Sequence, residues 1–187
     1  MKKDIERIFF ESIQVKKDTL SQCRDDIILA AREILSVFRQ GGKIMFFGNG
    51  GSAADSQHAA AEFIGRFQRE RRSLAAIALT TDTSILTALS NDYSVDIIFA
   101  RQIEGLGRKG DIAFCISTSG NSANVVAGID KACGMGIKTI ALTGRSGGRL
   151  SSMVDICIRV PSDKTARIQE AHLCIIHTIC QIVEDRI

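Results

Sequence analysis

A histidine and a glutamate stand four residues apart in this sequence, just after a glycine-rich turn. The stretch KIMFFGNGGSAADSQHAAAEF, from Lys43 to Phe63, contains both His58 and Glu62. On a helix this spacing puts two side chains on one face, about 6 Å apart along the axis, where they can hold a metal or move protons. An isolated pair of this kind is more often a hydrogen-bonded pair on a surface or in a core. The only other histidines, His172 and His177, lie in RIQEAHLCIIHTIC, which strengthens the hypothesis of a site at His58 and Glu62.

The segment GNGGSAADS joins an apolar run to a helix-like stretch. Asn49, Gly50 and Gly51 follow the run, and Ser52 is expected to cap a helix over residues 52–67. The start of a helix presents free backbone N–H groups, which bind anions. The pattern is neither the lysine-containing phosphate loop nor the dinucleotide motif GxGxxG, so it does not indicate a nucleotide site. By itself the segment is equally consistent with a capped turn that binds nothing.

A second turn of the same kind carries an unusual number of hydroxyl groups. In DIAFCISTSGNSANVV, residues 111–126, a buried strand again leads through a loop of small residues into a helix. A phosphate monoester requires hydroxyls and helix N-terminal amides, and Gly120 lets the backbone approach a ligand. Ligands of open parallel sheets bind at the carboxyl ends of the strands, where both loops should lie. We therefore predict a phosphate site formed by Ser117, Thr118, Ser119 and Ser122.

The apolar pattern changes its period along the chain. Residues 3–22 and 25–39 repeat apolar side chains at three- and four-residue steps, which predicts two leading helices, the second ended by Gln40–Gly42. Five short apolar runs then predict buried strands that alternate with helices, an order that favours parallel pairing. We predict an α/β fold with a doubly wound five-stranded parallel sheet flanked by helices. The expected strands are KIMFFG, LAAIAL, DIAFCIS, KTIALTG and DICIRV.

Length and composition are those of one ordinary globular domain. We expect a single domain over residues 1–187, with leading helices in 1–40 and an α/β core in 41–187. A net charge of +3 indicates neither a nucleic-acid nor a membrane partner. The first residues do not suit a signal peptide, and no apolar stretch approaches the ~20 residues of a membrane span. The six cysteines include no CxxC pair and are expected to be buried thiols in a reducing cytoplasm.

The expected last helix, about residues 165–185, is apolar almost all round. Helices of this kind are buried, and in a chain of this size oligomerisation is a natural way to bury one. The alternative is that the helix packs wholly inside the monomer. We favour an oligomer.

Several motifs together resemble the sugar isomerase (SIS) domain family over nearly the whole chain. They are GNGGSAADSQHAAAEF, LSNDYS, STSGNSANV, ALTG followed by GG, and RIQEAHLCIIH. Within this family the chain is similar to the isomerases of heptose phosphates that serve bacterial surface polysaccharide synthesis. The resemblance implies conversion of sedoheptulose 7-phosphate to D-glycero-D-manno-heptose 7-phosphate, the first step towards ADP- or GDP-heptose. It also implies a cytoplasmic homotetramer with active sites at its subunit interfaces.

The resemblance also implies which residues bind metal and substrate. One zinc ion per subunit would be held by His58, Glu62, Gln169 and His177. The sugar phosphate would contact the two loops, a turn-like Asn–Asp pair in SNDYS and two of the metal ligands. These residues are Asn49, Gly50, Gly51, Glu62, Asn91, Asp92, Ser117, Thr118, Ser119, Ser122 and Gln169. Some members have an acidic residue where this chain has Ala166, so a helper carboxylate is not supported there.

Two members of this ligand set are far apart on the expected last helix. Gln169 and His177 are eight residues apart, a rise of about 12 Å on an ideal helix, whereas two ligands of one zinc each lie only ~2 Å from the ion. Three arrangements stay open: the two side chains lean together, the helix is irregular at Gln169, or the ligands come from different subunits. His172 is expected to be a packed helix-face residue rather than a catalytic one.

The implied chemistry moves a proton between C1 and C2 of the sugar through an enediol intermediate. Glu62 is expected to be the base at carbon, and His177 the acid that serves the oxygens. Zinc would polarise the carbonyl or hold the diol oxygens. A zinc-bound carboxylate is a weakened base, so either Glu62 leaves the ion when sugar binds or the metal only organises the site.

Two further classes of SIS protein are alternatives. One is a non-catalytic binding protein that associates with the bacterial replication initiator, with which this chain shares ERRSLAAIAL and LTALSND. The presence of both Glu62 and His177 favours the enzyme. The other is a sugar-binding regulator, but such proteins usually append a DNA-binding domain, and no segment of this chain fits one.

Overall fold

The five short apolar runs form the strands of one parallel sheet. The computed structural model describes all 187 residues, and it orders the strands β2-β1-β3-β4-β5. The strands are β1 (Ile44–Gly48), β2 (Ala76–Ala78), β3 (Ile112–Ser117), β4 (Lys138–Thr143) and β5 (Ile156–Arg159). Every residue of β1 and β3 is buried, as continuous apolar strands covered on both faces should be. The predicted fold class is confirmed.

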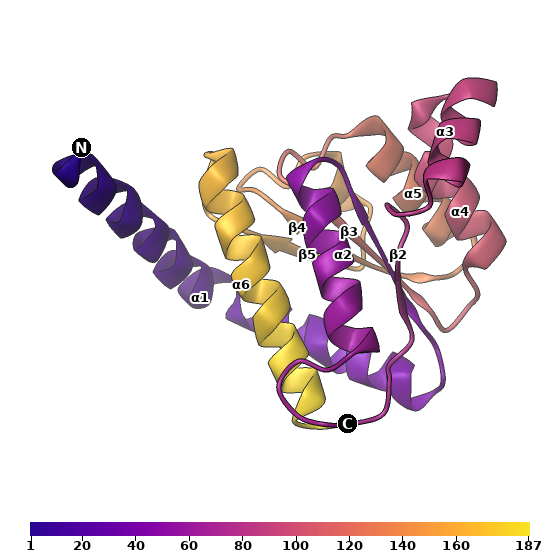
Figure 1. Cartoon of the computed structure of the whole chain (residues 1–187), viewed down its shortest axis with the longest axis horizontal. Helices are drawn as coiled ribbons and strands as arrows, with labels where there is room; N and C mark the ends of the chain where they lie inside the picture. Colours follow the sequence, from indigo (N-terminus) through magenta and orange to yellow (C-terminus); the bar gives the residue numbers. More distant parts are fainter.

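Helices cover both faces of the sheet and enclose two separate apolar cores (Figure 1). α1 (Lys2–Arg39), α2 (Gly51–Ile64) and α6 (Thr165–Glu184) pack on one face. The other face holds α4 (Ile98–Leu106) and α5 (Ala123–Gly134), with α3 (Thr83–Asp92) at their edge. Two short 3₁₀ helices, η1 (Val95–Ile97) and η2 (Arg149–Ser152), complete the elements. None of the helices combines the length and the apolar character that crossing a membrane requires.

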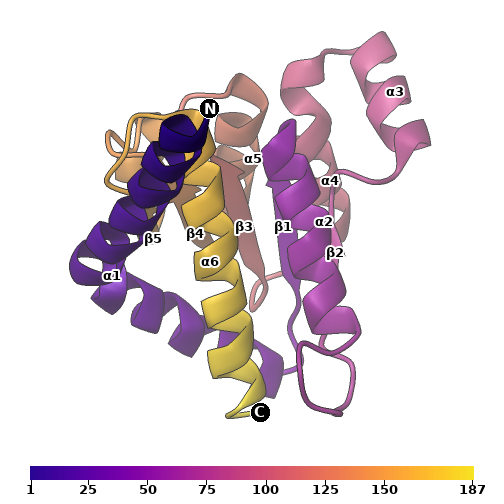
Figure 2. The ribbon, with the colours of Figure 1, turned by 60° about the vertical axis from the view of Figure 1, so that its left-hand side comes forward.

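The two predicted leading helices are one continuous helix, so that part of the prediction is wrong. α1 runs from Lys2 to Arg39 and passes through the expected break at residues 23 and 24. Neither glycine nor proline occurs there, so no residue type stops the helix. Figure 2 shows that α1 bends along its length. The Thr19 hydroxyl donates to the Val15 carbonyl at 2.7 Å, a bond that commonly accompanies helix bending.

The cysteines are less uniformly buried than predicted. All six are free thiols, and Cys23, Cys115 and Cys180 are buried, but Cys133 and Cys174 are exposed. Cys133 lies on α5 and Cys174 on α6, each on an exposed face of its helix. Apolar neighbours in the sequence therefore did not mean that these thiols are buried.

Candidate active site

His58, Glu62 and His177 converge where α2 and α6 lie side by side (Figure 2). His58 Nε2 lies 2.9 Å from Glu62 Oε1 and 3.4 Å from His177 Nε2. The four-residue spacing on α2 places the first two on one face, and the packing of α6 brings the third. The side chains of His58 and Glu62 are 42% and 21% exposed, so ligands from solvent or another chain can reach them.

This histidine cluster, meaning His58, Glu62 and His177, has the donor set of a metal site. The three candidate ligand atoms lie within 4.8 Å of one another. Around tetrahedral zinc, with bonds of about 2.0–2.1 Å, ligand atoms stand about 3.3 Å apart. The distances of 2.9 and 3.4 Å bracket that spacing. Two imidazole nitrogens and a carboxylate oxygen therefore fit one divalent ion, with a fourth position left for another ligand.

Asp55, which the sequence analysis did not single out, lies one turn before His58 on α2. Burial raises the pKa of the Asp55 carboxyl, and the neighbouring His58 opposes that shift. Its Oδ2 is buried without a hydrogen-bond partner. The sequence could have pointed to Asp55, because it stands three residues before His58 and so lies on the same face of the helix.

The two loops predicted to bind phosphate meet at the carboxyl ends of neighbouring strands β1 and β3. A reciprocal pair of side-chain amide bonds joins them: Asn49 Nδ2 donates to Asn124 Oδ1 at 2.8 Å, and Asn124 Nδ2 donates to Asn49 Oδ1 at 3.0 Å. Asn124 is buried and was missed by the sequence analysis. The signal would have been an asparagine shortly after each strand, Asn49 directly after β1 and Asn124 in the first turn of α5.

The hydroxyl loop, meaning residues 117–122, is folded back on itself by hydrogen bonds among its own groups. Ser117 is buried and its hydroxyl accepts a bond from Gly120 N–H at 3.2 Å, while Ser122 lies 3.4 Å from it. Thr118 is half-buried and Ser119 is exposed, so hydroxyls are presented at several depths. Ser122 directly precedes α5, whose free N–H groups face the same loop.

Ser52 does not cap α2, contrary to the prediction. The N-cap position belongs to Gly50, whose φ of 56° is left-handed, and Ser52 is buried inside the first turn. α2 begins at Gly51, one residue before the predicted start at Ser52, and it ends at Ile64 instead of at residue 67. No side chain caps this end of α2, and the N–H groups of Ser52 and Ala53 donate to the backbone carbonyls of Asn49 and Gly50, each at 3.0 Å.

Gln169 lies with the loops and not with the histidine cluster. A Cβ on Gly51 would overlap the side-chain amide of Gln169, so the absence of a side chain at Gly51 makes room for it. α6 is a regular helix from Thr165 to Glu184, so it is not irregular at Gln169, and Gln169 and His177 stand about 12 Å apart along its axis. The position of Gln169 beside Gly51 favours the arrangement in which the ligands come from different subunits.

Asn91 and Asp92 occupy the exposed C-terminal end of α3 instead of an open turn. Asn91 Nδ2 donates to Asp92 Oδ1 at 2.9 Å, so the two side chains bond to each other and not to the loops. Asp82 caps the N-terminal end of α3 by accepting a bond from Ile85 N–H at 2.9 Å. Figure 1 shows α3 standing at the outer edge of the molecule.

His172 is a packed residue, as predicted. It is fully buried, and its Nε2–H donates to the Thr143 carbonyl at the end of β4, at 3.1 Å. Burial lowers the pKa of His172 to about 4. Its role is to fasten α6 to the sheet in the neutral state.

The depressed pKa of His172 predicts acid-sensitive stability. Above the ordinary value of 6.5 both folded and unfolded chains are neutral here, and as pH falls from 6.5 to about 4 only the unfolded chain gains the proton. The folded protein should therefore lose about 2 kcal/mol at pH 5 through this group. His172→Gln, which retains an N–H donor, should show a correspondingly flatter dependence of unfolding free energy on pH in urea titrations. Equal slopes for the two proteins would contradict this assignment.

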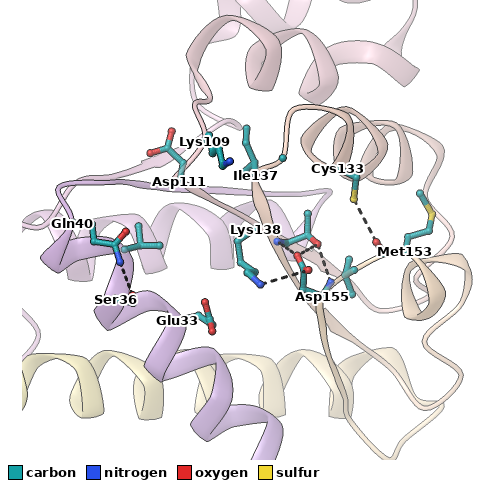
Figure 3. A pocket seen from close by; sticks show the side chains of 15 residues that line it. Glu33, Ser36, Gln40, Lys109, Asp111, Cys133, Ile137, Lys138, Met153 and Asp155 are labelled. Carbon is teal, nitrogen blue, oxygen red and sulfur yellow. Dashed lines mark hydrogen bonds and ion pairs between the residues drawn. The ribbon is translucent and has the colours of Figure 1, made fainter.

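A hollow lies at the opposite end of the strands from the two loops (Figure 3). It measures about 750 Å³ and is lined by residues near the amino ends of β3, β4 and β5. Two of its three carboxylates already have partners, since Asp155 accepts bonds from Thr139 and Asp111 accepts bonds from Lys43 and Arg108. A smaller groove of about 550 Å³ borders His177, next to Phe67 and Leu173. The groove, and not the hollow, borders the histidine cluster.

Comparisons with known proteins agree with this geometry. The SIS domain family model matches residues 9–144. The chain is 55% identical over 92% of its length to the phosphoheptose isomerase of Roseiflexus sp., covering 88% of that protein, and 49% identical over its full length to that of Aquifex aeolicus, covering 98%. Its structure resembles phosphoheptose isomerase GmhA from Neisseria gonorrhoeae with a TM-score of 0.94 at 44% identity, covering 98% of both chains. The chain therefore belongs to the SIS domain family and, within it, to the phosphoheptose isomerases.

Proposed function

We propose that this protein interconverts sedoheptulose 7-phosphate and D-glycero-D-manno-heptose 7-phosphate as the first step of heptose supply for bacterial surface polysaccharide. The convergence of Glu62 and His177 in a chain with these relatives carries the proposal. The replication-initiator-associating alternative is not favoured, because the relatives at half identity are phosphoheptose isomerases.

The phosphate group would bind at the hydroxyl loop. Ser117, Thr118, Ser119 and Ser122 supply hydroxyl groups, and the first turn of α5 supplies N–H groups. Binding energy from this remote group holds C1 and C2 in place for proton transfer. Asn49, Gly50, Gly51 and Gln169 border the same space and would contact the sugar, and Asn91 and Asp92 would have to reach it from a neighbouring subunit.

Proton transfer would use Glu62 and His177. Glu62 takes the proton from one carbon and returns it to the other, and His177 moves protons at the two oxygens. The groups need to reach a carbon and its oxygen at once, and their candidate atoms lie within 4.8 Å of each other. A pair this close can serve adjacent atoms of one substrate.

A zinc ion is the metal that the histidine cluster fits best. His58, Glu62 and His177 would hold it, with Gln169 of another subunit as a further ligand. When bound, it would supply Lewis-acid polarisation of the substrate oxygens.

The arrangement of the two halves of the site supports a homotetramer with interfacial active sites. From Gly51, beside the loops, to His58 the rise along α2 is about 10 Å, so the histidine cluster of one chain lies away from its own loops. A neighbouring subunit could place its cluster over them. The side chains of Phe9, Phe10 and Leu20 on α1 are each more than 60% exposed, as expected of a surface that another chain covers.

Free thiols at Cys133 and Cys174 support a location in the reducing cytoplasm. That location would also be where phosphorylated sugars are made. The single domain expected over residues 1–187 stays part of the proposal.

The direct test is an isomerase assay. Purified protein incubated with sedoheptulose 7-phosphate should produce an aldose 7-phosphate, detected by NMR of the anomeric proton. In deuterated water the product should carry deuterium at C2, because the proton passes through a base that exchanges with solvent. Absence of any aldose product at high enzyme concentration would reject the proposed reaction.

Metal removal gives a second expected result. Protein prepared without chelator should contain about one zinc per chain, and a chelator should lower kcat at least tenfold. Adding zinc back should restore the activity. Full activity in protein shown by elemental analysis to be metal-free would rule out a role for zinc.

A further inference from the structure

A buried carboxylate at the end of α6 holds the loop that follows α2. Glu184 Oε1 accepts a bond from Phe67 N–H at 2.9 Å, and its Oε2 accepts bonds from Gln68 N–H at 2.7 Å and Arg69 N–H at 2.8 Å. It also forms an ion pair with Arg71 at 3.2 Å, and the two side chains are only 1% and 10% exposed. A carboxylate that accepts several backbone N–H bonds is strongly held in its charged form, and these bonds keep the pKa of Glu184 below its ordinary value despite burial.

Arg71 in turn closes the C-terminal end of α2. Its Nη2 donates to the Glu62 carbonyl at 2.7 Å, and its Nη1 donates to the carbonyls of Phe63 at 2.9 Å, Gly65 at 3.0 Å and Arg72 at 3.0 Å. The last carbonyls of a helix lack intrahelical partners. The guanidinium therefore satisfies the turn that carries Glu62, and its planar fork reaches several carbonyls at once.

The loop held by Glu184 also carries an aromatic contact to the site. The Phe67 ring lies 5.4 Å from the His177 ring, and His177 in turn lies edge-on to His58 at 4.9 Å between ring centroids. Figures 1 and 2 show this loop passing around the C-terminal end of α6. One buried ion pair thus contacts both helices whose side chains form the histidine cluster.

We propose that Glu184 and Arg71 form a positioning clamp for the acid–base pair: Arg71 fixes the helical turn of Glu62, and Glu184 fixes Phe67 against His177. This inference rests on the proposed function for its catalytic meaning. Neither residue reaches the reacting atoms, so their effect acts through Glu62 and His177. Burying an ion pair is costly and need not add stability, which is consistent with retention for positioning.

The decisive variant is Glu184→Gln, which keeps the size of the side chain but places an amide N–H₂ among N–H donors. Asp111→Asn is the matched control, because Asp111 is 6% exposed, pairs with Lys43, and accepts N–H bonds from Lys43 and Arg108. It lies at the opposite edge of the sheet, outside the proposed site. Arg71→Lys is the second variant, in case Glu184→Gln does not fold. Lysine keeps the positive charge but lacks the planar guanidinium that donates to several carbonyls at once.

The first readout is independent of activity. With only three histidines in the chain, the imidazole signals of ¹⁵N-histidine-labelled protein can be resolved individually. Glu184→Gln or Arg71→Lys should shift the His58 and His177 signals and leave that of His172 in place, whereas Asp111→Asn should leave all three unchanged. Unchanged His58 and His177 signals in a folded clamp variant would overturn the proposal.

The second readout is kinetic. The clamp variants should lower kcat at least tenfold while KM stays within about twofold, because the phosphate loops are untouched, and Asp111→Asn should leave both constants near those of the wild type. Equal kcat losses in clamp variants and control, at matched thermal stability, would also overturn it. If the wild-type protein proves not to isomerise sedoheptulose 7-phosphate, the proposed function fails, but the histidine spectra still decide whether the clamp positions the cluster.

Discussion

Replacing Glu62 by glutamine should lower kcat for sedoheptulose 7-phosphate by roughly 10²- to 10⁴-fold, the usual contribution of a general base. The amide keeps the size of the side chain and an oxygen acceptor 2.9 Å from His58, but it cannot take a proton from carbon. KM should change little, because in our proposal the hydroxyl loop, and not Glu62, holds the phosphate. Turnover is measured by following aldose formation, and sugar-phosphate binding by calorimetry.

Glu70→Gln is the matched control for this experiment. Glu70 follows the same helix, is 90% exposed, and makes only a long 3.8 Å contact with Arg66. It should retain wild-type turnover, since an exposed pair of this kind contributes little. Zinc content should be measured in both variants, so that loss of metal is not mistaken for loss of the base. A Glu62→Gln protein with normal metal content that turned over at the wild-type rate would remove Glu62 from the mechanism.

Replacing Gly120 by alanine should raise KM at least tenfold and destabilise the fold by about 3 kcal/mol. Gly120 has a left-handed φ of 66°, and a Cβ there would overlap the Gly147 carbonyl and lie 3.0 Å from Gly148 N. These are backbone atoms that cannot rotate away, so the hydroxyl loop must shift. The loss of phosphate affinity is read from KM, and the stability from the urea midpoint.

Gly134→Ala provides the comparison for Gly120. Gly134 is the last residue of α5, and a Cβ there would meet nothing within 4 Å. We expect wild-type KM and equal or slightly higher stability, because alanine is the better helix former. If Gly120→Ala behaved like Gly134→Ala, the hydroxyl loop would not be the rigid phosphate cradle described here.

The hydropathy pattern alone was sufficient to predict the parallel sheet and the end of the sheet at which the two loops lie. Each strand is a continuous apolar run such as IAFCIS, and parallel strands bring their carboxyl ends to one edge, so Ser117 and Asn49 had to lie at the same edge. That their strands are direct neighbours is seen only in the structure. The His58–Glu62 contact followed equally from the helical period. These features depend on local periodicity and connectivity, which the order of residues contains.

Contacts between elements were decided only by the tertiary structure. Whether residues 2–39 form one helix or two was decided by the structure, although the absence of glycine and proline near Cys23 is consistent with one helix. The sequence could not show that His177 joins His58 while Gln169 lies beside Gly51, because that depends on how α6 packs along α2. The Glu184–Arg71 pair joins residues 113 positions apart (184 minus 71), and burial, not sequence spacing, makes it an ion pair. Periodicity determines which face of a helix is apolar, but the register and depth at which two helices meet depend on the packing of the whole core.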